Sequence, residues 1–124
     1  MLSREIMTII EAIEDFRESA IAKADGAKPA SKDHELHARM TRAFVCLTSH
    51  GENGIAAFTE LLQDESSHVR IWVAAQFLAE GCRSAIPIME QLATQPGIQG
   101  FSAAMTLKEF HSGCLRSPFT TSVV

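Results

Sequence analysis

The stretch from residue 69 to residue 79 constrains the fold of this chain more than any other. On a helical wheel its apolar side chains point in nearly every direction: they are Val69, Ile71, Trp72, Val73, Ala74, Ala75, Phe77, Leu78 and Ala79. A helix that is apolar on all sides belongs between neighbours rather than against water. The polar turn 64–67 precedes this stretch, with Ser66 or Ser67 as the N-cap, and Gly81 ends it. The sequence therefore predicts a central buried helix on which the other elements pack.

A long amphipathic helix is predicted over residues 3–24. Ser3 is its expected N-cap, Glu5 and Lys23 complement the helix dipole, and Gly26 and Pro29 end it. Apolar residues recur along one stripe at steps of three and four: Leu2, Ile6, Ile9, Ile10, Ile13, Phe16 and Ala20. The helix also has an acidic face, formed by Glu11, Glu14, Asp15 and Glu18. We interpret this face as the solvated side of the helix; the alternative is that it docks a partner.

Four more helices follow from the same kind of pattern. The second ends near Ser49, is capped by Asp33 or Ser31, and turns inward Leu36, Met40, Ala43 and Leu47. The third covers 55–63 and buries Ile55, Phe58, Leu61 and Leu62. The fifth has Ser84 as its cap and Pro87 in its first turn, where proline is tolerated. The sixth ends near His111 and uses Ile98, Phe101, Ala104, Met105, Leu107 and Phe110. We expect one helical domain over residues 1–113 and a partly ordered tail over 114–124.

The last four predicted helices repeat at an interval of about 30 residues. The apolar set Ile55, Phe58 and Leu61 recurs as Ile86, Met89 and Leu92. A second set recurs in the same way, with Val69, Ala74, Ala75 and Leu78 matched by Ile98, Ala103, Ala104 and Leu107. A two-helix unit with this period is typical of a helical solenoid, because each pair buries its apolar faces only by stacking on the next.

The residues of this repeat resemble a known family. The residues that carry the resemblance are the turn residue Asp64, then Val69-Arg70 and Ala74-Ala75, then Ala85-Ile86-Pro87 with Met89 and Leu92. The pattern is similar to HEAT repeats, especially the short variety named from phycobilisome lyases. The resemblance covers about residues 52–112. It implies a small stand-alone bacterial domain with an α-α superhelix of six helices in three antiparallel hairpins, a short HEAT/armadillo-like solenoid. It also implies a structural polar pair between Asp64 and Arg70. Ala93 and Gln99 stand where the next such pair would fall, so the polar ladder is incomplete.

Composition narrows the classes of function. A chain of 124 residues with a net charge of −4 predicts one globular domain and argues against a general nucleic-acid binder. Cys46, Cys82 and Cys114 are widely spaced and odd in number, which favours buried, reduced thiols in a cytosolic protein. No apolar run reaches the roughly 20 residues that cross a bilayer, and the acidic N-terminal segment is unlike a signal peptide. We therefore expect a soluble, cytoplasmic protein without a membrane partner.

The leading functional hypothesis is a non-enzymatic protein-protein interaction module, either an adaptor or an inhibitory partner of the immunity-protein kind. In a helical solenoid the second helices of successive pairs line one surface. The residues expected on that surface as partner anchors are Arg42, His68, Trp72, Gln76, Phe101 and Met105. Core packing of Trp72 and Phe101 is the alternative. We expect no catalytic residues, cofactor or resident metal; the partner's identity stays open, as does self-association through an exposed end.

Two other functions are compatible with the sequence. His34 and His37 lie one helical turn apart, a spacing that suits a small metal- or ligand-binding protein or enzyme, although no third ligand is near. A weaker alternative is nucleic-acid binding through Lys28, Lys32, Arg39 and Arg42. Acidic residues interrupt that basic cluster, so a solvated face of mixed charge is favoured.

Overall fold

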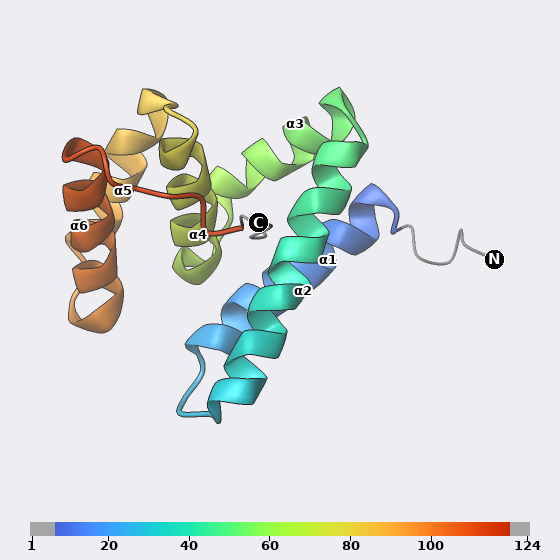
Figure 1. Ribbon diagram of the computed structural model, residues 1–124, viewed down its shortest axis with the longest axis horizontal. Helices are drawn as coiled ribbons and strands as arrows, with labels where there is room; N and C mark the ends of the chain where they lie inside the picture. Colours follow the sequence, from blue (N-terminus) through green and yellow to red (C-terminus); the bar gives the residue numbers. More distant parts are fainter. Residues whose placement is uncertain (1–6, 120–124) are drawn as a thin grey trace. The chain divides into compact units, whose positions relative to one another are not determined.

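The computed structural model describes residues 7–119, and this part of the chain is all-α, as predicted, with six α-helices and no strand (Figure 1). The helices are α1 (Ile9–Ala24), α2 (Ala30–Ser49), α3 (Glu52–Glu60), α4 (Ser67–Ala79), α5 (Ile86–Ala93) and α6 (Gly97–His111). Short 3-10 turns, η2 (Leu61–Gln63) and η3 (Arg83–Ala85), follow α3 and precede α5. The chain forms two compact units, and the boundary between them falls between Leu61 and Leu62.

Helix α1 begins at Ile9, where a capping box fixes its first turn. The Thr8 hydroxyl accepts the N–H of Glu11 at 3.1 Å, and the Glu11 carboxylate accepts the N–H of Thr8 at 2.9 Å. Together these bonds satisfy two N–H groups at the helix start. The prediction of a helix from residue 3 is therefore wrong for residues 7 and 8, which are not helical. Ser3 and Glu5, the predicted cap and first-turn acid, lie outside the described residues.

The first unit consists of an antiparallel pair, α1 and α2, with α3 packed against both. Its core is apolar and includes three Phe rings in contact. The Phe58 ring meets the Phe16 ring edge-on at 5.4 Å and the Phe44 ring at 5.0 Å. The inward residues predicted for α2 are all buried, namely Leu36, Met40, Ala43 and Leu47. Two predicted inward residues, Ile10 and Ile55, are instead exposed.

Helix α2 starts earlier than the sequence predicted. Its N-cap is Pro29 rather than Ser31 or Asp33, and Asp33 lies in the first turn instead. There the Asp33 carboxylate accepts a hydrogen bond from Lys23 Nζ at 2.8 Å, near the end of α1. The contact of Asp33 with the preceding helix replaces the expected cap.

Two glycines allow the chain to come unusually close to the backbone of a preceding segment. A Cβ added to Gly54 would lie 1.8 Å from the carbonyl oxygen of Leu47, and a Cβ added to Gly100 would lie 1.7 Å from that of Gln95. Each glycine lies in the first turn or so of its helix, α3 or α6, and faces the end of the helix or turn before it. These contacts explain why both positions lack a side chain.

In the second unit, α4 packs against α5, α6 and the turn η3. Every residue of α4 is buried or half-buried, and the Ser66 hydroxyl caps the helix by accepting the N–H of His68 at 3.2 Å. The core of the unit lies between α4, α5 and α6, and its buried members are Ala74, Leu78, Ala85, Met89, Leu92 and Ala103. Pro87 occupies the first turn of α5 as expected, but Ser84 is not the cap, because η3 intervenes and Ala85 holds that position.

Helices α4 and α6 end in the same backbone motif. After α6, Gly113 adopts a φ of +80°, its N–H bonds to Phe110, and the N–H of Cys114 bonds back to the carbonyl of Glu109 at 2.9 Å. After α4, Gly81 and Cys82 make the corresponding bonds to Leu78 and Phe77. This Schellman motif reverses the chain direction at a left-handed glycine. After α6 it directs residues 114–119 back over α4 (Figure 1).

The internal repeat is only partly reflected in burial. Met89 and Leu92 are buried like Phe58 and Leu61, and Ala103 is buried like Ala74. The matched pair Val69 and Ile98 differs, because Val69 is fully buried whereas Ile98 is exposed. The unit boundary falls between α3 and α4, inside the segment predicted to form the central hairpin. The three-hairpin superhelix stays a prediction.

Candidate functional site

The candidate site is an exposed apolar stripe on α6, formed by Ile98, Phe101 and Met105. Their exposed fractions are 83%, 66% and 38%. The spacing of i, i+3 and i+7 places the three side chains on one face of the helix, and the exposed residues Lys108 and Ser112 continue that face. We call Ile98, Phe101 and Met105 the α6 stripe. All three belong to the apolar set that the sequence assigns to the sixth helix, and Phe101 and Met105 are also among the expected partner anchors.

The opposite face of α6 makes the packing contacts. Gly100 and Ala103 are buried, and Leu107 and Phe110 pack against the core of the second unit. Arg83, before α5, places its guanidinium 5.6 Å from the centre of the Phe110 ring. Helix α6 is therefore apolar on two opposite faces, of which only one is covered. An exposed, contiguous apolar face is the kind of surface that marks an interaction site.

Other exposed large apolar side chains are scattered. In the first unit they are Ile10, Ile21, Val45 and Ile55. They are spread over three helices, and the two on α1 are three turns apart. Single exposed apolar residues of this kind are ordinary on protein surfaces. The α6 stripe is distinguished by having three such residues within two turns of one helix.

The remaining predicted anchors on the second helices have different surroundings. The Trp72 ring is half-buried and lies 6.1 Å from the ring of Phe119. Gln76 is buried and accepts a hydrogen bond from the Ser117 hydroxyl. His68 is half-buried and its Nδ1 lies 3.2 Å from Nε2 of Gln99, whose oxygen accepts a bond from Ser67. Of these anchors in the second unit, the structure therefore leaves Phe101 and Met105 exposed and covers Trp72 and Gln76 with the C-terminal segment.

Arg42, the remaining predicted anchor, is exposed on α2 in the first unit. A single partner surface that includes Arg42, Trp72 and Phe101 therefore stays a prediction.

Asp64 and Arg70, predicted as a structural polar pair, make a local contact between the turn before α4 and the first turn of that helix. Arg70 Nη1 donates to the backbone carbonyl of Asp64 at 2.7 Å. The Asp64 carboxylate accepts the N–H of Ser66 at 3.0 Å, which holds the turn that leads to the helix cap. The arrangement shapes the entry to α4.

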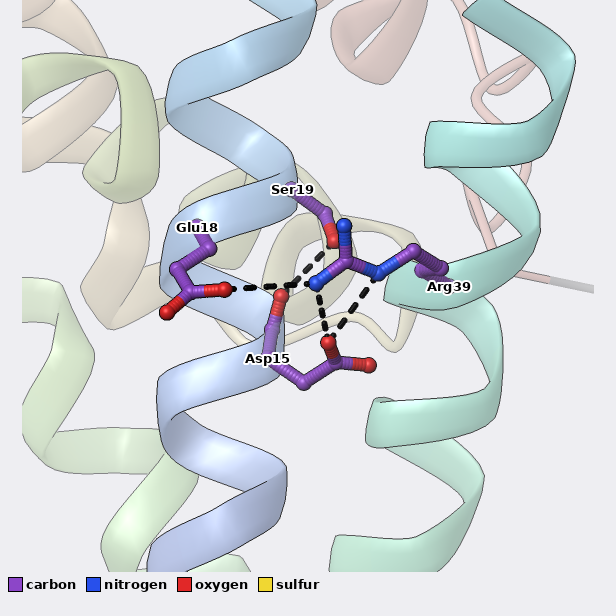
Figure 2. Close-up of polar contacts among 4 residues, drawn as sticks. All are labelled: Asp15, Glu18, Ser19 and Arg39. Carbon is purple, nitrogen blue, oxygen red and sulfur yellow. Dashed lines mark hydrogen bonds and ion pairs between the residues drawn. The ribbon is translucent and has the colours of Figure 1, made fainter. Parts of the chain in front are cut away.

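The first unit contains a polar network between its two long helices (Figure 2). Arg39 of α2 donates through Nε to the Asp15 carboxylate at 3.0 Å, and its Nη2 donates to both Asp15 and Glu18 of α1. The hydrogen bond to Asp15 raises the pKa of Arg39. The buried Ser19 hydroxyl donates to the Asp15 carbonyl at 2.7 Å. Part of the predicted acidic face therefore holds α2 against α1.

Most of the predicted basic cluster has structural partners. Lys28 Nζ donates to the carbonyl oxygens of Lys23, Asp25 and Gly26 at 2.9–3.0 Å, so it caps the end of α1. Lys32 Nζ lies 3.8 Å from Oε1 of Glu35, and the Arg39 guanidinium forms an ion pair with the Asp15 carboxylate. Carboxylates and carbonyls next to these cations favour the interpretation of a solvated face of mixed charge over a phosphate-binding surface.

His34 is exposed and His37 half-buried on the first half of α2. Within residues 7–119 no group of three or more His, Cys, Asp or Glu side chains is placed to hold a metal ion.

The three cysteines form no disulfide. Cys46 and Cys82 are half-buried, but Cys114 is exposed, contrary to the expectation of buried thiols. In that same part of the chain, no helix is both long and apolar enough to cross a membrane.

Comparison with known proteins gave no match: no family model fits the chain, and neither curated proteins nor solved structures include a similar one. The geometry of the α6 stripe is therefore the basis for a functional proposal.

The C-terminal contacts are the part of the surface that sequence reasoning missed. Residues 114–119 have no helical period, so the sequence indicated only a tail. The available signal was Leu115 and Phe119, two large apolar residues in an otherwise polar segment. Apolar residues of this size in a tail indicate a segment that packs back onto the domain.

Proposed function

We propose that this chain is a non-enzymatic protein-binding module that presents α6 to its partner. The observation that carries the proposal is the α6 stripe, three large apolar side chains left uncovered at helical spacing. Side chains at i, i+3 and i+7 are the anchors by which an amphipathic helix enters a hydrophobic groove on another protein. The partner chemistry that fits is therefore an apolar groove that accepts one face of a helix.

The size of the stripe favours a modest, reversible contact. Three side chains at these exposures offer apolar area on the order of a few hundred Å². A stable interface of standard size needs about 800 Å² from each partner. An adaptor or an inhibitory partner that inserts α6 into a groove gains additional area from the walls of that groove. The HEAT-like repeat and a cytoplasmic location, both inferred from the sequence, belong to this proposal.

A comparison of variants in a pull-down tests the proposal. The full chain is tagged and exposed to nuclease-treated lysate of its native host, and co-eluting proteins are identified for the wild type and for Phe101→Ala. We expect a stoichiometric protein to be retained by the wild type and lost by Phe101→Ala, because an aromatic anchor at the centre of a contact carries much of its binding energy.

The matched control is Glu90→Ala, an exposed residue on the neighbouring helix α5. It should retain the same protein. Both variants should melt at nearly the wild-type temperature, because their side chains are exposed. Identical sets of co-eluting proteins for all three chains would contradict the use of α6.

A further inference from the structure

Residues 115–119 contact α4 and the core of the second unit through their side chains. After the Schellman turn at Gly113, the last backbone–backbone hydrogen bond described is that of Cys114 to Glu109. Beyond it, Leu115 packs against the core of the second unit, and Ser117 and Phe119 contact α4. The segment therefore adds no helix or strand to the fold, and its contacts resemble those of a bound peptide.

Ser117 makes two hydrogen bonds with one hydroxyl group. It donates to Oε1 of Gln76 on α4, and it accepts the N–H of Phe119 at 3.1 Å. The second bond closes a tight turn around Pro118 and fixes the direction of the Phe119 side chain. The Ser117 hydroxyl therefore links the turn before Phe119 to the amide of Gln76.

Gln76 accepts the hydrogen bond from that hydroxyl through its side-chain amide. It is only 4% exposed, and both ends of its amide are used, since Nε2 donates to the Glu80 carboxylate at 2.6 Å while Oε1 accepts from Ser117. A buried amide oxygen is stabilised by such a partner. The carboxylate of Glu80 behind the amide makes the position unfavourable for a negatively charged residue.

Phe119 provides the apolar part of the contact. It is 3% exposed, and its ring lies 6.1 Å from the Trp72 ring at an interplanar angle of 41°. This separation and tilt lie within the range that aromatic pairs prefer. Side chains that carry much of the binding energy of an interface lie in well-packed, desolvated pockets, and Phe119 is buried in this way.

We propose that the surface of α4 around Trp72 and Gln76 is a docking site for an extended peptide segment in which Ser or Thr precedes an aromatic residue by two positions, and that residues 115–119 are its resident, exchangeable occupant. The site binds a neutral hydroxyl and excludes a phosphorylated or acidic residue there. It uses a surface different from the α6 stripe, so the two proposals succeed or fail separately.

Trp72 allows a direct test, because it is the only Trp in the chain and the chain has no Tyr. In the full-length variant Phe119→Ala we expect the fluorescence emission of Trp72 to shift to longer wavelength and acrylamide quenching to increase. The peptide Leu-Arg-Ser-Pro-Phe, with blocked ends, should reverse both changes in a saturable manner. A peptide with Ala in place of Phe should bind roughly tenfold or more weakly, because an aromatic anchor has been removed. A peptide carrying phosphoserine should fail to reverse the changes.

The variant Arg116→Ala serves as the matched control, since Arg116 is exposed in the same segment, and its emission should equal that of the wild type. Ser117→Ala is a second, milder variant whose smaller shift the same peptide should also reverse; far-UV circular dichroism confirms that the helices persist. The proposal is overturned if Phe119→Ala leaves the emission unchanged, or if the emission shifts and no peptide reverses it. A wild-type dimer with concentration-dependent emission would assign the occupant to a second copy and overturn its assignment to the same chain.

Discussion

At the scale of single residues, two glycines set the distance between adjoining segments. Gly54 and Gly100 lie in different units, yet each presents its Cα to a carbonyl oxygen of the preceding segment, Leu47 or Gln95. A helix normally gains stability when glycine is replaced by alanine, by about 1 kcal/mol. Here the space for a methyl group is occupied by backbone, which a rotamer change cannot move.

The first prediction concerns Gly54→Ala. We expect this substitution to lower the free energy of unfolding by about 1–3 kcal/mol, the usual cost of inserting a carbon into a closely packed region, despite the better helix propensity of alanine. Chemical denaturation measures the change. Asn53→Ala, at an exposed neighbouring position of α3, is the matched control and should change stability by less than about 0.5 kcal/mol. An increase in stability for Gly54→Ala would contradict the close approach to Leu47.

A second residue-scale feature links the end of α1 to the start of α2. Lys23 Nζ donates to the Asp33 carboxylate, and this hydrogen bond holds the pKa of Asp33 below its usual range. A carboxyl group whose pKa is lower in the folded state stabilises that state at pH values above its unfolded pKa. The contribution is lost as the pH falls through the lower, folded-state pKa.

The second prediction follows from that sign. Between neutral pH and about pH 4 the contribution of Asp33 should be constant, and below about pH 4 it should decrease with falling pH. Asp33→Asn should therefore lose stability near neutral pH and show a shallower decline in acid than the wild type. Because the Asp33 side chain is substantially exposed, the difference should be small. Denaturation midpoints measured from pH 7 to pH 2 provide the test; parallel curves for the two chains would rule out this role for the pair.

At the scale of elements, sequence pattern predicted the number of helices and the buried positions of α2 and α4. In these two helices the apolar pattern permits one assignment of the buried face, because α2 has a single apolar stripe and α4 is apolar throughout. The pattern did not predict the buried face where two assignments are possible. Helix α6 has apolar residues on opposite faces, and the sequence does not specify which face meets α5. Thus the sequence places Phe101 and Met105 among the candidate partner anchors, but it gives Ile98 only as one of the apolar residues of the helix.

Other failures arose at helix ends and in the C-terminal segment. Thr8 and Glu11 form a capping box at the start of α1, whereas the apolar period in the sequence continues upstream to Leu2 and predicts an earlier start. The contact between Phe119 and Trp72 joins residues far apart in sequence, and no local periodicity reports such a pairing. Tertiary contacts of an irregular segment are inaccessible to helical-wheel reasoning.

At the scale of the whole molecule, each of the two compact units has its own apolar interior. In the first unit the aromatic contacts join Phe16, Phe44 and Phe58. In the second, all the members of the described core cluster lie between Leu62 and Leu115. Because each core is formed within its own segment, we expect each unit to open without the other.

The third prediction uses one core substitution in each unit. Met89→Ala removes a fully buried side chain from the second unit and should cost about 2–5 kcal/mol, and Phe58→Ala in the first should cost about 3–5 kcal/mol. Hydrogen exchange resolved by peptide should show faster exchange in α4, α5 and α6 for Met89→Ala, and in α1, α2 and α3 for Phe58→Ala. Acceleration of all six helices by either substitution would show that the chain opens as one cooperative unit.

The uncovered face of α6 also determines how the protein behaves in concentrated solution. Molecules with a net charge of −4 repel one another weakly, and at 0.15 M salt this repulsion decays over about 8 Å. Near pH 5.7, where the net charge vanishes, or in high salt, little opposes contact between apolar faces. The protein should therefore be purified and concentrated at slightly alkaline pH and low ionic strength, where electrostatic repulsion maintains its colloidal stability.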